Sequence, residues 1–298
     1  MLKIPDLQKN VILASYTTYK IGGHADYFFV AKNKAELVEA VVEARKNKMK
    51  YFILGTGANI LVGDKGFRGL VIKNESDTIR IDGDFVISES GATIHDLIEN
   101  TLNLNLSGFE HFAGIPSTVG GAVWQNLHFL SPDRSKTVFV GDIIDSAEIL
   151  DEGNNIVKVN RDFFNFDYDH SVLHDRNLLV TEVRFTLTPK EKELIQNQID
   201  ENLKWRNERH PNVVEFPSCG SVFKKIADIG VGRLIDETGL KGYKIGGAMV
   251  SEKHANFIVN TGGAKAKDVC SLIELIKEKV FDKTGHKLQT EIGFVGEF

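Results

Sequence analysis

A short apolar strand, Tyr51 to Leu54, runs directly into the stretch Gly55-Thr56-Gly57-Ala58-Asn59-Ile60-Leu61. Glycine lets the backbone approach a ligand closely, and consecutive amides in such a turn can converge on an anion. The stretch is not a dinucleotide fingerprint, because Ile60 occupies the place of the third glycine. Taken alone, it fits a tight turn as well as it fits a phosphate-binding loop.

Further along the chain lies a second loop of small residues, Ala113-Gly114-Ile115-Pro116-Ser117-Thr118-Val119-Gly120-Gly121-Ala122. It offers glycines and hydroxyl side chains just before another apolar turn. Two such loops in one chain favour a cradle for a pyrophosphate group over two ordinary turns. The sequence therefore predicts a nucleotide or flavin site.

Helices and strands alternate around these two loops. Asn33 can cap a helix over residues 34–47, whose apolar residues form one stripe. The turn Asp82-Gly83-Asp84 joins two alternating strands into a hairpin. Further strands are predicted at 27–31, 69–72, 147–150, 156–159 and 178–187, and further helices at 93–104, 191–208 and 266–281. This order predicts an α+β fold with a mixed N-terminal part and a smaller C-terminal part.

Composition limits the classes of protein and partner. The chain has 298 residues, 42% of them hydrophobic, so it can bury a core in about two domains. Its 36 lysines and arginines against 41 aspartates and glutamates give a net charge of −5, which argues against nucleic acid as a partner. The nine histidines and two cysteines show no metal-ligand spacing, so no metal site is expected.

Targeting signals are also absent from the sequence pattern. The first residues lack the apolar core of a signal peptide, and no apolar run approaches the ~20 residues of a membrane span. Two cysteines that cannot form a disulfide framework suit a reducing cytosol. We therefore expect a soluble cytoplasmic protein that does not act on a membrane.

Several longer motifs, taken in order, resemble one family of flavoenzymes. They are Thr18-Tyr19-Lys20-Ile21-Gly22-Gly23-His24-Ala25-Asp26, the first glycine loop through Gly66-Phe67-Arg68-Gly69, the second loop from Ala113 to Gly121, Gly220-Ser221-Val222-Phe223-Lys224, Gly232-Arg233-Leu234-Ile235-Asp236-Glu237-Thr238-Gly239-Leu240-Lys241-Gly242, Ser251-Glu252-Lys253-His254-Ala255-Asn256-Phe257 and Thr290-Glu291-Ile292. Together they resemble the UDP-N-acetylenolpyruvoylglucosamine reductase (UDP-N-acetylmuramate dehydrogenase) family, in its shorter type without an inserted substrate loop. The resemblance covers essentially the whole chain, and the C-terminal motifs are more specific than either glycine loop.

The resemblance implies a fold and an activity. The fold would be a two-subdomain FAD-binding fold of the vanillyl-alcohol-oxidase-like (PCMH) type, with subdomains at residues 1–74 and 75–190. A linker helix and a C-terminal α+β substrate-binding domain would occupy residues 191–298. NADPH would reduce the bound FAD, and the flavin would then pass a hydride to the enolpyruvyl group of UDP-N-acetylglucosamine enolpyruvate. The product, UDP-N-acetylmuramate, is a precursor of peptidoglycan.

By the same resemblance, the backbone of both glycine loops would hold FAD. The cofactor-binding residues would be Gly55, Thr56, Gly57, Ala58, Asn59 and Ile60 in the first loop, and Gly114, Ile115, Pro116, Ser117, Thr118, Gly120 and Gly121 in the second. Basic side chains suit a UDP diphosphate, so Lys224, which matches a family position, and its neighbour Lys225 are candidate substrate-binding residues. The alternative for both is a solvated lysine after a strand.

The chemistry fixes which side chains the reaction needs. Hydride addition puts negative charge on the carbon next to the substrate carboxylate, and that carbon must then be protonated. Ser221 matches the family's proton donor, although without the resemblance it would be a turn hydroxyl. Glu291 matches the family's glutamate that helps to stabilise the enol-like intermediate, although alone it would be a solvated strand residue.

The chain departs from the family pattern at two places. The family has a catalytic arginine in a Tyr-Arg-x-Ser run, but this chain reads Tyr168-Asp169-His170-Ser171. A carboxylate there would have to be protonated, turned away, or paired with a cation such as Arg176 or His170.

The second departure is the bulky segment from Trp124 to Lys136, in which Trp124 is expected to be a core residue. Both departures leave open another flavin oxidoreductase on the same scaffold, or a homologue that binds flavin with impaired catalysis.

Overall fold

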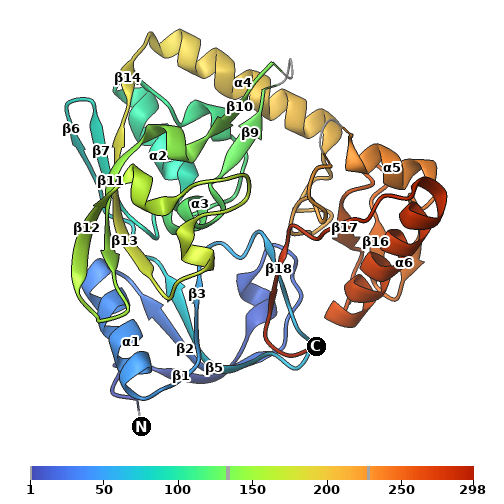
Figure 1. Cartoon of the computed structure of the whole chain (residues 1–298), viewed down its shortest axis with the longest axis horizontal. Helices are drawn as coiled ribbons and strands as arrows, with labels where there is room; N and C mark the ends of the chain where they lie inside the picture. Colours follow the sequence, from blue (N-terminus) through green and yellow to red (C-terminus); the bar gives the residue numbers. More distant parts are fainter. Residues whose placement is uncertain (1, 132–134, 227–228) are drawn as a thin grey trace. The chain divides into compact units, whose positions relative to one another are not determined.

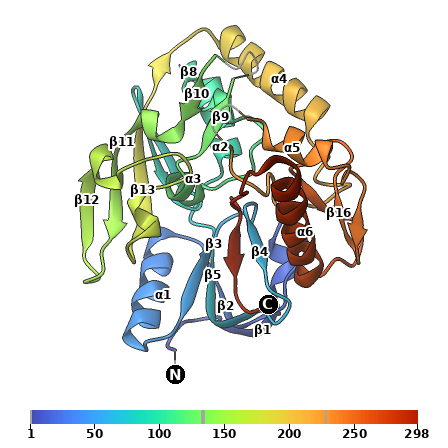
Figure 2. The same cartoon turned by 45° about the vertical axis from the view of Figure 1, so that its right-hand side comes forward.

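The computed structural model describes residues 2–131, 135–226 and 229–298 (Figures 1 and 2). Helices and strands alternate along most of this chain, and both pack around apolar cores. The predicted α+β class is confirmed. No helix of the described residues combines the length and the apolar character that a membrane span would need.

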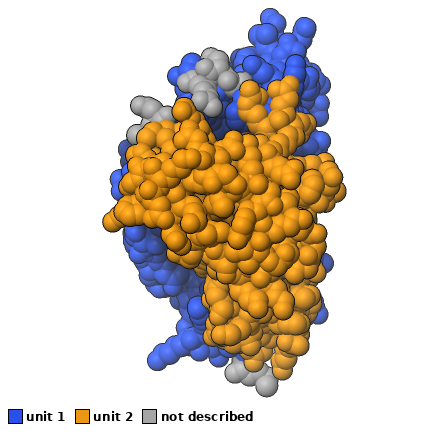
Figure 3. Space-filling model, turned by 90° about the vertical axis from the view of Figure 1, so that its right-hand side faces the viewer, with its two compact units in different colours: residues 1–6, 29–55, 72–206 blue, residues 7–28, 56–71, 207–298 orange. Residues whose placement is uncertain are grey.

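The chain divides into two compact units, which Figure 3 distinguishes by colour. Unit 1 comprises residues 1–6, 29–55 and 72–206, and unit 2 comprises residues 7–28, 56–71 and 207–298. The strands β2 (His24–Ala31) and β5 (Phe67–Asn74) each start in unit 2 and end in unit 1. They form a four-stranded sheet in the order β1-β2-β5-β3, with β1 at Gln8–Ile12 and β3 at Tyr51–Leu54.

Unit 1 is built on a five-stranded antiparallel sheet in the order β12-β11-β13-β7-β6. The strands are β6 (Ile79–Asp82), β7 (Phe85–Glu89), β11 (Ile144–Leu150), β12 (Ile156–Asn160) and β13 (Leu179–Thr186). The predicted hairpin at Asp82-Gly83-Asp84 is confirmed, because Asp82 pairs with Phe85 across the turn.

Three helices of unit 1 each begin at a residue whose side chain caps the first turn. The side chain of Asn33 accepts the amide of Glu36 and so starts α1 (Lys34–Lys46), as predicted. Thr93 and Asp96 form a capping box at the start of α2 (Ile94–Asn103). The third helix, α3 (Val119–Gln125), lies where the sequence predicted the second half of a loop, so that prediction was wrong.

The apolar faces of α2 and α3 contribute to one core with the sheet strands. Its members include Leu97, Ile98, Val119, Val123, Phe109 and Phe185. Leu106–Ser107 (β8) pairs with Thr188–Pro189 (β14), and His128–Leu130 (β9) pairs with Thr137–Phe139 (β10). Short 3₁₀ turns in this unit lie at Glu110–Phe112, Val140–Ile143, Arg161–Phe164 and Val172–His174.

The predicted polar helix is α4 (Lys192–Arg209). It buries Ile195, Ile199 and Asn202, and the Asn202 amide donates to the carbonyls of Glu110 and His111. The chain passes from unit 1 to unit 2 after Arg206, in the last turn of this helix.

Unit 2 contains a small sheet and two further helices. The strands β15 (Lys244–Ile245), β16 (Ala248–Val250) and β17 (Ile258–Asn260) pair in that order, and the helices are α5 (Val231–Glu237) and α6 (Ala266–Thr284). The apolar stripe predicted for the last helix is buried in α6, through Val269, Leu272, Ile273, Ile276 and Val280. Leu13–Tyr16 forms a 3₁₀ turn, and β4 (Ile60–Val62) pairs in parallel with β18 (Gly293–Val295).

Candidate active site

The structure brings the start of the first glycine loop against the second loop within unit 1. A Cβ atom placed on Gly55 would lie 2.6 Å from Oγ1 of Thr118, a distance that real Cβ atoms do not tolerate. The same Oγ1 accepts a hydrogen bond from the amide of Gly121 at 3.2 Å, so the threonine has little room to turn away. Glycine at position 55 therefore allows the two loops to touch.

The rest of the first loop, in unit 2, exposes donors suited to an anion. Gly57 has a φ of +67°, and a Cβ there would lie 2.5 Å from the carbonyl oxygen of Tyr16. The backbone amides of Gly57, Ala58 and Asn59 donate no hydrogen bond to any described residue. These unpaired amides in a glycine turn fit a phosphate group of the predicted cofactor.

The second loop has fewer amides to offer. The amides of Val119 and Gly120 already donate to the carbonyls of Ala92 (2.8 Å) and Ser90 (2.7 Å), and Gly121 donates to Thr118. Ile115 donates to Phe112. Within the described residues, the amides of Ser117 and Thr118 donate to no partner. Their cofactor role, like that of Gly114 and Pro116, stays a prediction.

In unit 2 the segment that carries Ser221 pairs with the segment that carries Glu291. The amide of Glu291 donates to the carbonyl of Val222 at 2.8 Å, and that of Lys224 donates to Gln289 at 2.9 Å. Phe223 and Thr290 form a bridge between these two hydrogen bonds. The segments that carry the predicted proton donor and the predicted glutamate are therefore paired side by side.

Asn256 holds the serine segment from its other side, a role that sequence reasoning missed. Its side-chain amide donates to the carbonyl of Phe223 (2.9 Å) and accepts the Phe223 amide (3.0 Å), while its own carbonyl accepts the amide of Val222 (2.8 Å). The Ser251–Phe257 motif forms a tight turn around it, because Ser251 Oγ accepts the amides of Lys253 and His254. The family-like position of Asn256 was the available signal.

Two other predicted residues of this region differ in exposure. Lys224 is half-buried on the paired segment, and Lys225 is exposed.

Cys219 is buried as expected, and burial raises the pKa of its thiol well above the usual range, with the Glu291 carboxylate adding to the effect. A thiol with such a pKa is not a nucleophile at neutral pH.

Asp169, at the position of the family arginine, is buried in unit 1. Its side chain has no exposed surface, and Oδ1 lies 3.5 Å from Nδ1 of His128, whose ring stacks on Tyr168 at 4.4 Å. The two side chains named as possible partners of Asp169 contact other carboxylates: Arg176 pairs with Glu152, and His170 lies beside Asp175. Neither of the named cations pairs with Asp169, whose buried carboxyl group instead lies beside His128 of the departing segment.

Trp124 is not a core residue, so that expectation was wrong. It is 45% exposed, because the buried face of α3 consists of Val119, Ala122 and Val123 and the next position points outward. Its ring packs on His174 at 4.4 Å, and its carbonyl accepts the Ser171 hydroxyl at 2.9 Å. The stretch 132–134 of the same segment lies outside the described residues.

Two basic side chains that sequence reasoning missed lie on the loops of unit 1. Lys73 Nζ donates to the carbonyl of Gly55 at 2.9 Å. Arg206 packs over Gly114, where a Cβ would lie 3.1 Å from its Nε. No motif marks either residue, since Lys73 lies near the end of β5 and Arg206 lies in a basic run typical of a helix end.

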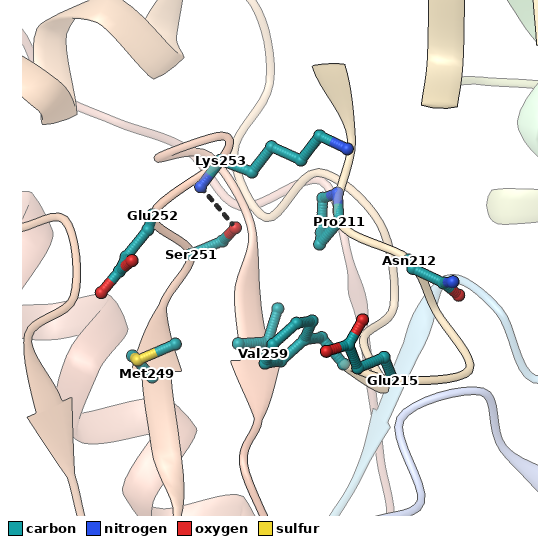
Figure 4. Close-up of a pocket in the computed structure, with 9 residues that line it drawn as sticks. Pro211, Asn212, Glu215, Met249, Ser251, Glu252, Lys253 and Val259 are labelled. Carbon is teal, nitrogen blue, oxygen red and sulfur yellow. Dashed lines mark hydrogen bonds between the residues drawn. The ribbon is translucent and has the colours of Figure 1, made fainter. Parts of the chain in front are cut away.

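A small cavity of about 260 Å³ lies in unit 2 (Figure 4). Glu215 lies on one side of it and Met249 and Glu252 on the other, and Phe216 and Val259 also belong to its lining. None of the predicted site residues lines it. It is also smaller than the clefts that hold molecules of drug size, so it does not accommodate FAD.

Comparisons with known proteins identify two domain families in the chain. Residues 25–160 match an FAD binding domain family, and residues 211–295 match the C-terminal domain of UDP-N-acetylenolpyruvoylglucosamine reductase. The chain is 38% identical to the UDP-N-acetylenolpyruvoylglucosamine reductase of Caldanaerobacter subterraneus subsp. tengcongensis, over 100% of this chain and 96% of the relative. It is 37% identical to that of Clostridium botulinum, over 96% of this chain and 91% of the relative.

A solved structure shows the same fold. The crystal structure of the UDP-N-acetylenolpyruvylglucosamine reductase from Thermus caldophilus matches with a TM-score of 0.80 at 32% identity, covering 96% of this chain and 97% of that chain. The FAD-binding part, the paired serine and glutamate segments and these matches define an FAD-dependent oxidoreductase. Within that class, the chain belongs to the UDP-N-acetylenolpyruvoylglucosamine reductase family.

Proposed function

We propose that this protein reduces UDP-N-acetylenolpyruvoylglucosamine to UDP-N-acetylmuramate in the cytoplasm, with FAD as cofactor and NADPH as reductant. The relatives that carry this enzyme name match nearly the full chain, and both domain families match in the expected order. The product enters peptidoglycan and so serves cell shape and division. Residues 1–74 and 75–190 would be the FAD-binding subdomains, and 191–298 the substrate-binding part.

The observation that carries the proposal is the pairing of the Ser221 and Glu291 segments in unit 2. Three contacts fix this pairing: the amide of Glu291 on Val222, the amide of Lys224 on Gln289, and the bridge between Phe223 and Thr290. A hydroxyl and a carboxyl group carried on paired segments can act on the same substrate carbon.

The chemistry follows from these two residues. Bound FAD, once reduced, supplies the hydride that adds to the enolpyruvyl double bond. The Ser221 hydroxyl then gives its proton to the carbon next to the substrate carboxylate, where negative charge has developed. Glu291 stabilises the enol-like form of that carboxylate, and Lys224, with Lys225 beside it, holds the substrate diphosphate.

An anaerobic experiment on the two half-reactions tests the proposal. NADPH should bleach the flavin of the purified protein, and UDP-N-acetylenolpyruvoylglucosamine should then restore its absorbance rapidly. A protein that takes up no FAD would refute the flavin function altogether. A flavin that NADPH reduces but this substrate does not reoxidise would refute the substrate.

A second candidate function rests on Asp169. With an inward carboxylate where the family has an arginine, the same scaffold would act on a different substrate. This candidate predicts reduction of the flavin without reoxidation by UDP-N-acetylenolpyruvoylglucosamine, so the same experiment separates the two.

A further inference from the structure

The second glycine loop cannot balance the charge of a flavin diphosphate with its own amides. Three consecutive amides at its end, those of Val119, Gly120 and Gly121, already donate within the protein. Backbone amides carry only partial positive charge, so side-chain cations near the loops would add to what the unpaired amides of residues 57–59, 117 and 118 supply. Two basic residues of unit 1, Lys73 and Arg206, meet this condition.

Lys73 lies at the first loop. It projects from β5, and its Nζ donates to the carbonyl oxygen of Gly55 at 2.9 Å, at the point where Gly55 contacts Thr118. It forms no ion pair with a described residue. Burial lowers its pKa, and the charge of Glu75 opposes this only in part.

Arg206 lies at the second loop. Its Nε and Cδ pack where a Cβ of Gly114 would be, at 3.1 and 3.2 Å. It makes no hydrogen bond or ion pair with any described residue. Burial alone lowers the pKa of its guanidinium to about 10.

Other basic side chains of unit 1 are differently placed. Lys34 pairs with Glu148 and Glu182, and Arg176 pairs with Glu152. Withdrawing a cation from water without a counter-ion costs free energy, and an anionic ligand would offset that cost. Lys73 at Gly55 and Arg206 at Gly114, both within unit 1, are therefore candidate partners of an anionic ligand.

We infer that Lys73 and Arg206 bind the diphosphate of FAD and supply the charge that the second loop lacks. This inference rests on the FAD dependence of the proposed function. A charged hydrogen bond to phosphate contributes about 1.5–3 kcal/mol, which corresponds to about 10–100-fold in affinity. Riboflavin, which has the same ring and no phosphate, should gain nothing from either side chain.

Equilibrium binding to full-length protein stripped of flavin tests the inference. Lys73→Met and Arg206→Met should each weaken FAD binding about 10–100-fold and leave riboflavin binding and thermal stability unchanged. Lys73→Arg should recover most of the affinity. Lys158→Met, which removes an exposed lysine of the same unit, is the control and should bind FAD as the wild type does.

Salt provides a readout that does not depend on riboflavin. Rising potassium chloride should weaken FAD binding to the wild type, and less steeply in either methionine variant, because one screened ion pair is gone. If the methionine variants unfold, Lys73→Gln and Arg206→Gln replace them. Unchanged FAD affinity and salt slope, or an equal loss for FAD and riboflavin, would overturn the inference. A wild type that binds no FAD would refute the proposed function itself.

Discussion

Asn256 hydrogen-bonds the main chain of Phe223 with both ends of its side-chain amide, at 2.9 and 3.0 Å. Asn256 and Phe223 are both buried. Phe223 is two residues from Ser221 and forms the bridge to Thr290. The asparagine therefore acts on the candidate site by fixing the backbone that carries the serine.

Asn256→Ala should destabilise the protein by about 2–4 kcal/mol, because it leaves a buried amide and a buried carbonyl without partners. Denaturant unfolding of the flavin-free protein measures this loss. Reoxidation of the reduced flavin by substrate should slow, while its reduction by NADPH stays intact. Asn100→Ala, which removes an exposed hydrogen bond of α2, is the control. A stability equal to that of the control would contradict the role of Asn256.

Ser221→Ala should slow the second half-reaction by about 10²–10⁴-fold, the usual contribution of a positioned acid. Reduction of the flavin by NADPH should not change, because no proton from Ser221 is needed there. Stopped-flow absorbance of the flavin follows both steps separately. Ser271→Ala removes an exposed hydroxyl of α6 and should leave both rates as they are. Equal rates for Ser221→Ala and wild type in the second step would mean that another group is the acid.

Local patterns in the sequence predicted much of the fold. The cap at Asn33 and the turn at Asp82-Gly83-Asp84 depend on neighbours within a few residues, and both are confirmed. α3 was missed because Gly120 and Gly121 disfavour a helix. Tertiary contacts outweigh that preference, since Val119, Ala122 and Val123 are buried and the first amides bond to Ser90 and Ala92.

The candidate site was predictable only where motifs mark it. Ser221 and Glu291 were predicted from their motifs, and the segments that carry them pair. Lys73 and Arg206 have no motif, because what distinguishes them is partial burial beside the two glycine loops without an ion pair to a described residue, which arises from the folded structure. The inward orientation of Asp169 likewise depends on His128, which is 41 positions away in the chain.

Asp169→Arg should destabilise the protein and should not raise turnover. Its backbone has a φ of +55°, which Asp and Asn tolerate better than Arg, and its side chain is enclosed beside His128. A guanidinium there would be buried without a carboxylate, at a cost of about 3–5 kcal/mol. Asp169→Asn keeps the shape and the backbone preference and should stay folded. Thermal unfolding compares the two variants, and a gain of turnover in Asp169→Arg would show that the departure from the family is a handicap.

Stability should fall as the pH drops below about 6.5, and His254 should account for part of this fall. Burial, followed by the charge of Lys241, lowers the pKa of His254 in the folded state. The unfolded chain therefore binds this proton more readily than the folded chain. The free energy of unfolding decreases as the pH falls from the ordinary histidine pKa toward the lower pKa of the folded state. Burial lowers the pKa of His111 as well, so some of the loss remains when His254 is replaced.

His254→Gln should therefore lose less unfolding free energy than the wild type between about pH 7.5 and about pH 5.5. Its amide oxygen can still accept the amide of Asn256, as Nδ1 of the histidine does at 3.2 Å, which keeps the turn around the site. His95→Gln replaces an exposed histidine on α2 and should follow the wild-type curve. Parallel curves for His254→Gln and the wild type would mean that His254 titrates alike in the folded and unfolded chains, and that the acid sensitivity arises from His111 and from the carboxylates.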